Sequence, residues 1–108
     1  MDDDNQIIVP PSFIALCSDA RGRLRMSAAT VRERHELCED LACSLVERAQ
    51  QAHHDAPSEQ GVLAGMHAAL ATPTSGLAPE EARWVVLRLA ELLGWHSPEL
   101  AEPGLSPR

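Results

Sequence analysis

His35 and Cys38 are the clearest pair of residues whose types and spacing suit catalysis or metal binding. They are three positions apart in a stretch without Gly or Pro, so a helix would place both side chains on one face. Such a pair is half of a zinc site, or a thiol beside a base. Cys43 falls on another face, and no third residue is evident to orient His35. Two interpretations stay open: the pair lies at the edge of a core, or it serves a thiol- or metal-dependent sensor.

Arginine is the second chemical signal, because all nine basic residues are Arg and five of them fall within positions 21–34. The five are Arg21, Arg23, Arg25, Arg32 and Arg34. As a connector, this cluster would be solvated and would pair with Asp19 and Glu33. As a docking patch, it would bind an acidic protein or a phosphate group. A third reading, nucleic-acid binding, conflicts with the net charge of −7.

Trp84 and Arg88 indicate a further interface. Trp84 lies off the main apolar stripe of its predicted helix and close to Arg88, and we expect it to be partly exposed. An exposed Trp near Arg is typical of an interface hot spot. The candidate partner-binding residues are therefore Arg21, Arg23, Arg25, Trp84 and Arg88. We expect no catalytic residue, no cofactor and no metal ion.

Composition excludes several classes of protein. Without Lys, the chain has no Walker A phosphate loop and no Schiff-base lysine. It has no apolar run of the roughly 18 residues that span a membrane. Three cysteines, an odd number, suit a reducing compartment better than a disulfide framework. The acidic start, MDDDNQ, is unlike a secretory signal. We expect a cytoplasmic, acidic protein without enzymatic activity or membrane contact.

The longest predicted element is a helix at 28–55, where Gly and Pro are absent. Apolar or small residues recur there at alternating spacings of four and three, which keeps one stripe on one helix face. The stripe consists of Val31, His35, Cys38, Ala42, Leu45, Ala49 and Ala52. Thr30 with Glu33 fits a capping box at its start, and Ser27 is the alternative N-cap. Pro57 lies just beyond its end.

Two shorter helices are predicted at 58–71 and 79–93. Ser58 is the expected N-cap of the first. Pro79 suits the first turn of the second, and Gly94 suits the left-handed position that ends it. Helix lengths place both against the second half of the long helix, with the last one starting near Cys43 and running parallel to it.

The apolar segment at 8–17 is expected to form a short helix, with a strand as the alternative. The first half of the long helix, around Val31, lacks another partner. We expect the segment to cover it through four apolar residues, and a homodimer through the same face is the alternative. The four are Ile8, Phe13, Ile14 and Leu16.

The sequence therefore predicts an all-α fold, a small bundle of three main helices with the 8–17 segment docked on the long one. With 108 residues, one domain is expected, at 7–95. Residues 1–6 are predicted to be a disordered tail and residues 96–108 a flexible one, because the first is charged and the second is rich in Pro.

Three stretches resemble a group of small uncharacterised proteobacterial proteins that are sometimes labelled ATPases with chaperone activity. They are IIVPPSFIAL, RHELCEDLA and PEEARWVVLRLAELLGW, and the resemblance covers roughly residues 7–95. It implies a cytosolic helical protein of unknown role and carries over no functional residue. The ATPase label finds no support in this chain, because the phosphate-binding loop is missing. The sequence favours a protein–protein interaction module: an adaptor, a regulator or a chaperone-like accessory protein whose partner is another protein.

Overall fold

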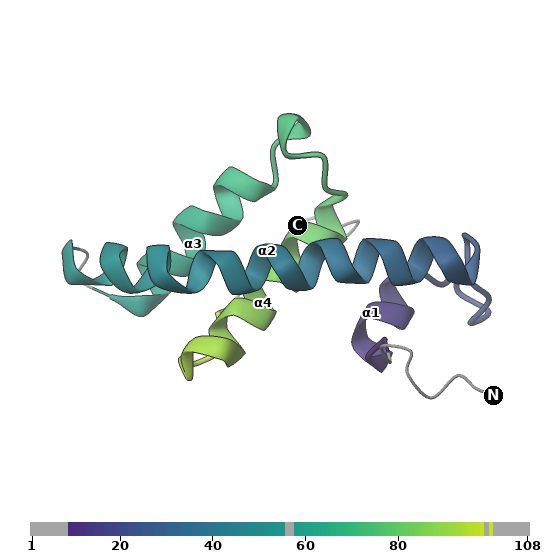
Figure 1. Ribbon diagram of the computed structural model, residues 1–108, viewed down its shortest axis with the longest axis horizontal. Helices are drawn as coiled ribbons and strands as arrows, with labels where there is room; N and C mark the ends of the chain where they lie inside the picture. Colours follow the sequence, from purple (N-terminus) through teal and green to yellow (C-terminus); the bar gives the residue numbers. More distant parts are fainter. Residues whose placement is uncertain (1–8, 56–57, 99, 101–108) are drawn as a thin grey trace, which may run out of the picture. The chain divides into compact units, whose positions relative to one another are not determined.

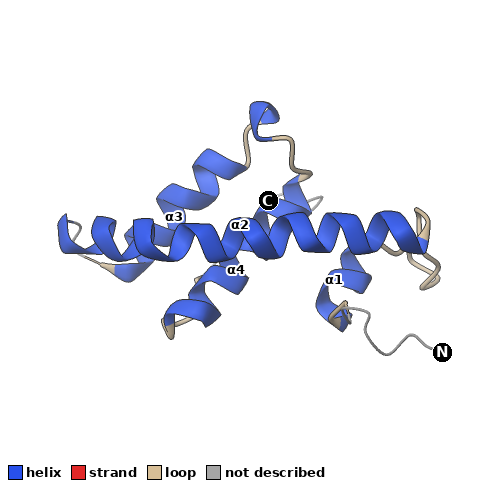
Figure 2. Ribbon diagram, in the orientation of Figure 1, coloured by secondary structure: helices blue, strands red, loops and turns tan. Residues whose placement is uncertain are grey.

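The computed structural model describes residues 9–55, 58–98 and 100. These residues form four α-helices: α1 (Pro11–Leu16), α2 (Ala28–Asp55), α3 (Glu59–Leu70) and α4 (Pro79–Leu93), with a 3₁₀ turn at Pro73–Ser75 (Figure 1). Figure 2 shows helix and loop alone throughout this described part. The all-α prediction with three main helices and a short N-terminal helix is confirmed. Its helix bounds match α2 and α4 and exceed α3 by one residue at each end.

The chain divides into two compact units, an N-terminal unit (Met1–Leu37) and a C-terminal unit (Cys38–Arg108), with the boundary inside α2. Each unit is described by itself. The single domain at 7–95 stays a prediction. The tail predicted at 1–6 lies outside the described residues, as does most of 96–108, although Pro98 is buried and Leu100 packs against the core of the C-terminal unit.

The N-terminal unit is built around the side chain of Phe13. Pro11 begins α1, a position where its fixed φ suits a helix and its missing N–H leaves no bond unmade. Phe13 and Cys17, one turn apart, are both buried. From α2, Val31 and His35 are buried as well, and the rings of Phe13 and His35 meet edge to face with their centroids 5.4 Å apart. The predicted docking of the N-terminal segment on the long helix is confirmed by this contact.

The residues that dock differ in part from the predicted set. Phe13 is buried as predicted and Leu16 is half-buried, but Ile14 is 40% exposed, so the prediction is wrong for Ile14. The reason is the helical period: Phe13 and Cys17 share one face, which leaves Ile14 on the flank. Ile8 lies outside the described residues.

Ser27 is the residue that caps α2. Its Oγ accepts a hydrogen bond from the backbone N–H of Thr30 at 3.1 Å. The alternative N-cap is therefore the correct one, and the predicted capping box of Thr30 with Glu33 is wrong. The helix starts three residues earlier than that box would allow, because Ser27 satisfies an N-terminal amide that has no partner within the helix.

The C-terminal unit has a core to which three helices contribute. Its buried cluster is Ala49 from α2, Val62 and Leu63 from α3, and Val86, Leu89 and Ala90 from α4. Half-buried side chains surround it, from α2 (Leu45, Val46, Ala52), α3 (Met66, Leu70), and α4 and its C-terminal extension (Leu93, Trp95, Leu100). Ser58 caps α3 as predicted, accepting from the backbone N–H of Gly61 at 3.0 Å.

The direction of α4 differs from the sequence prediction. Figure 1 shows α4 crossing α2, whereas helix lengths predicted that it starts near Cys43 and runs parallel. The middle of α4 consequently reaches Glu39 through Arg88, while Leu89 and Ala90 share a cluster with Ala49. Helix length fixes how far an element extends, but the crossing angle depends on how side-chain ridges pack.

Both ends of α4 follow local rules. Glu81 accepts the backbone N–H of Ala78 at 2.9 Å at the start. Gly94 ends the helix with φ of 74°, and the N–H of Trp95 then bonds to Ala90 O at 2.9 Å. Among the described residues, none of the helices combines the length and apolar character that a membrane span requires.

Candidate functional site

A tight turn carries three arginines of the cluster, Arg21, Arg23 and Arg25. We call residues 19–25 the arginine turn. Ser18 pairs with Leu24 in an isolated antiparallel bridge, and the N–H of Arg25 donates to Cys17 O at 2.8 Å. Gly22 takes φ of 84°, a conformation that other residues avoid, and its N–H bonds to Asp19 O at 2.9 Å. The turn therefore has a defined backbone.

Asp19 braces the arginine turn from within. Its Oδ1 accepts the backbone N–H groups of Arg21 at 2.9 Å and of Arg23 at 3.0 Å, as in an Asx turn. The sequence reading paired Asp19 with arginine side chains, but these bonds go to their backbone. The guanidinium groups of Arg21 and Arg23 form no ion pair with any residue that the structure describes.

The surface of the arginine turn is basic with one large apolar side chain. Arg21, Arg23 and Arg25 are exposed, and Leu24 between them is 43% exposed. Arg25 also donates from Nη2 to the carbonyl of Leu16, which ties the turn to the end of α1. Over residues 9–37, five arginines face three carboxylates, a net charge of +2. The predicted Arg21, Arg23 and Arg25 thus lie together on one turn.

Trp84 departs from the exposed position that the sequence suggested. It is only 8% exposed, so the expectation of a partly exposed Trp is wrong. The cause is that α4 is buried around most of its circumference rather than along one stripe. Its buried residues are Glu81, Ala82, Trp84, Val85, Val86, Leu89 and Ala90.

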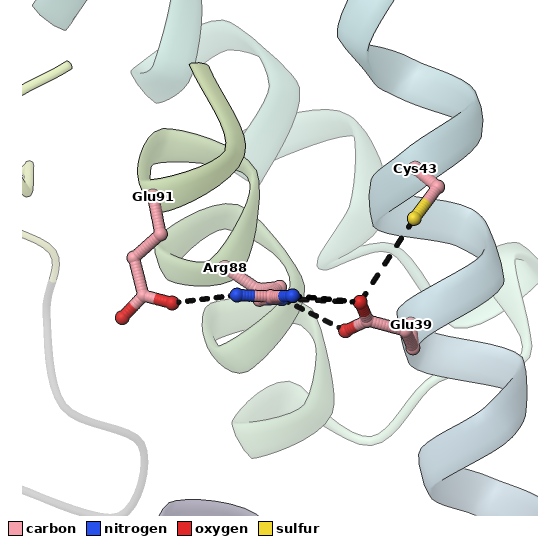
Figure 3. Close-up of polar contacts among 4 residues, drawn as sticks. All are labelled: Glu39, Cys43, Arg88 and Glu91. Atoms are coloured by element: carbon pink, nitrogen blue, oxygen red, sulfur yellow. Dashed lines mark hydrogen bonds and ion pairs between the residues drawn. The ribbon is translucent and has the colours of Figure 1, made fainter. Parts of the chain in front are cut away.

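Arg88 lies in a network of acidic side chains (Figure 3). Its Nε donates to Glu39 Oε1 and its Nη2 to Glu39 Oε2, each at 2.9 Å, and its Nη1 donates to Glu91 Oε1 at 3.0 Å. The hydrogen bond to Glu39, then that to Glu91, raises the pKa of the Arg88 guanidinium above its usual value. Cys43, an exposed thiol, lies with Sγ 3.9 Å from Glu39 Oε2.

Sequence reasoning named Arg88 but missed both of its partners. The contact with Glu91 could have been predicted from the sequence, because residues three apart on a helix are neighbours. The contact with Glu39 could not, because Glu39 is 49 positions away and its approach depends on how α4 crosses α2. Arg88 stays a predicted partner-binding residue, with its guanidinium already bonded inside the C-terminal unit.

A hollow of about 360 Å³ lies at the C-terminal end of α2, lined by Gln50, His53, His54 and Trp95. The sequence reading treated His53 and His54 only as the end of the helix. The ring of His53 is 5.1 Å from that of Trp95, tilted by 46°. The hollow therefore combines an aromatic wall with hydrogen-bonding side chains from one helix face.

The residues of the proposed sensor are placed as follows. His35 and Cys38 are both buried, and Cys17, Cys38 and Cys43 are thiols. Within the described part of the chain, no three His, Cys, Asp or Glu side chains are grouped as a metal ion would need. Comparisons with protein-family models, curated proteins and solved structures gave no match to this chain. The resemblance to small proteobacterial helical proteins stays a prediction.

Proposed function

We propose that this chain is a protein-binding module whose arginine turn docks an acidic segment of another protein. An adaptor, regulator or chaperone-like accessory role in the cytoplasm is its concrete form. The observation that carries the proposal is the use of Asp19: its carboxylate braces the backbone, which leaves the Arg21 and Arg23 side chains available for binding. Three thiols support a reducing compartment.

The chemistry of the turn suits carboxylates. A guanidinium presents a planar fork of donors that binds a carboxylate with two parallel hydrogen bonds. Because the backbone of the turn is already fixed, binding orders only the arginine side chains, which lowers the entropic penalty. Leu24, exposed between Arg23 and Arg25, adds an apolar contact. An acidic segment with interspersed apolar residues matches both features.

The same features favour a polypeptide over a nucleic acid. Single-stranded nucleic acid binds through aromatic side chains on which bases stack, and the aromatic rings of positions 1–37, Phe13 and His35, are both buried. Duplex binding rests on many phosphate contacts. Residues 38–108 carry ten carboxylates and four arginines, a net charge of −6, which repels a long polyanion more than a short acidic segment.

The direct test is fluorescence anisotropy with a labelled peptide of alternating Glu and Leu. We expect saturable binding that weakens as salt increases. Replacing both Arg21 and Arg23 by Gln should weaken it roughly tenfold, since two charged contacts at an exposed site together contribute about 1–2 kcal/mol.

Arg32→Gln is the matched control, because Arg32 is exposed in the same unit but lies outside the turn. A free-energy loss for Arg32→Gln equal to that per charge removed at Arg21 and Arg23 would assign the binding to net charge and contradict a site at the turn. Equal binding of a Gln–Leu peptide would exclude carboxylate recognition. A salt-dependent band shift with duplex DNA that needs Arg21 and Arg23 would assign the turn to nucleic acid instead.

A further inference from the structure

The hollow beside Trp95 has a wall that is fixed before any ligand arrives. Gly94 ends α4 in a left-handed conformation, and the hydrogen bond from the backbone N–H of Trp95 to Ala90 O holds the backbone of Trp95 in place. One part of the indole packs against the core cluster, and another lines the hollow with Gln50, His53 and His54. Gln50 and His54 are one helical turn apart on the same side of α2. A volume of about 360 Å³ falls within the range of small-ligand sites.

The electrostatics around the hollow favour a cation. No Arg is among its four lining residues, so none of them carries a permanent positive charge that would repel a cation. Three of them belong to the last two turns of α2, and Trp95 directly follows α4, so the hollow lies at the C-terminal ends of two helices, where the helix dipole is negative. Glu47 precedes Gln50 by one turn on the same face, while Arg48 falls on the other side of the helix. The unit as a whole has a net charge of −6.

We propose that this hollow binds a guanidinium group, as carried by an arginine side chain of a second polypeptide. A guanidinium is flat, so it stacks on the indole face of Trp95 and gains a cation–π attraction there. Its N–H groups find acceptors in Gln50 Oε1 and in the imidazole nitrogens, which a quaternary ammonium could not use. The site is separate from the arginine turn and does not depend on the function proposed for it.

The test uses N-acetyl-arginine amide as the probe and N-acetyl-citrulline amide as its neutral isostere. Binding is followed through the indole N–H resonances by NMR. Trp95→Leu identifies which of the two indole signals belongs to Trp95. We expect a saturable shift of that signal, with the citrulline compound roughly tenfold weaker. Methylguanidinium distinguishes the source: similar affinity assigns the site to any small guanidinium, and weaker binding assigns it to arginine in a peptide.

The adjacent glutamines give a matched pair of variants. Gln50→Leu should weaken binding about threefold or more, while Gln51→Leu, also exposed but outside the hollow, should leave it unchanged. Both positions are exposed on α2, so neither variant should disturb folding. Equal binding of the citrulline compound would overturn the proposal. So would shifts at the Trp84 indole alone, or an equal effect of the two glutamine substitutions.

Discussion

The two units solve the problem of a small core in different ways. The N-terminal unit depends on one aromatic side chain, Phe13, packed against His35 of α2. The C-terminal unit distributes its core over three helices, with Leu63 and Leu89 fully buried. Three of the four exposed large hydrophobic side chains of the described residues lie in the N-terminal unit, which also holds five of the nine arginines.

Under the proposed function, this difference would divide stability and binding between the two units. The N-terminal unit, with one central aromatic residue, leaves Ile14, Leu24 and Leu37 at its surface. Regions with few buried apolar groups open more readily than the core of a domain. We therefore expect the C-terminal unit to set the global stability and the N-terminal unit to supply the adaptable surface.

The largest effect should come from Leu89→Ala in the C-terminal unit. Leu89 is fully buried in a cluster with residues of α2 and α3, so truncation leaves a cavity that three helices cannot all close. We expect a loss of about 2–5 kcal/mol in the free energy of unfolding, measured by chemical denaturation. Leu92→Ala, three positions along and 37% exposed, is the control. An equal loss for both would mean that burial in this core does not dominate stability.

Phe13→Ala is the corresponding change in the N-terminal unit. It removes the ring that packs on His35, and we expect the free energy of unfolding of this unit to fall by about 2–4 kcal/mol. The loss should be smaller than for Leu89→Ala, because a pair of helices collapses more easily around a gap. The effect should be local. Hydrogen exchange should accelerate for the amides of α1 and the arginine turn, and stay slow in α4.

Ile14→Ala, at the neighbouring exposed position, should change exchange rates little. If Phe13→Ala accelerated exchange equally in α4, the two units would unfold as one. The comparison on which the division of roles rests would then fail.

Local chemistry explains which parts of the fold were predictable. Ser58, Pro79 and Gly94 fixed helix ends because each acts through its own backbone or nearest amides. The burial of Trp84 and the pairing of Arg88 with Glu39 depend on the crossing of α4 over α2, which no local pattern encodes. Periodicity placed Trp84 off the apolar stripe correctly, yet a helix buried around most of its circumference has no exposed side there.

The candidate sites divide in the same manner. The arginine turn was visible in composition, and Gly22 indicated a turn, but the role of Asp19 was read as a side-chain ion pair. An Asp three residues before a Gly is a recognisable turn signal, because an Asp side chain often bonds to the backbone two residues on, and it could have corrected this reading. The hollow at Trp95 was missed, because three residues of α2 form it together with Trp95, which follows α4 and is distant in sequence.

A smaller effect is expected from Asp19→Ala. The substitution removes an acceptor of two backbone N–H groups and should lower the local stability of the arginine turn by roughly 1 kcal/mol. Exchange of the Arg23 amide reports it. Asp19→Asn keeps an acceptor oxygen and should restore most of the protection. If Asn failed to do so, the charge of Asp19 rather than its geometry would hold the turn, and the brace that supports the docking proposal would be misassigned.

The smallest effect should come from the Arg88–Glu39 pair, although it is the best-formed ion pair printed in Figure 3. The two side chains are 34% and 27% exposed, so solvent screens them and the coupling free energy should be about 0.5–1 kcal/mol. A double-mutant cycle of Glu39→Gln and Arg88→Gln measures that coupling without the other contacts of each residue. The same cycle with Glu91→Gln should give a smaller coupling free energy, because Glu91 is 67% exposed and pairs with Arg88 through one hydrogen bond. The coupling should fall as salt increases. A coupling well above 1 kcal/mol that persists in high salt would show that the pair is desolvated. The ion pair would then stabilise the C-terminal unit together with the core that its three helices share.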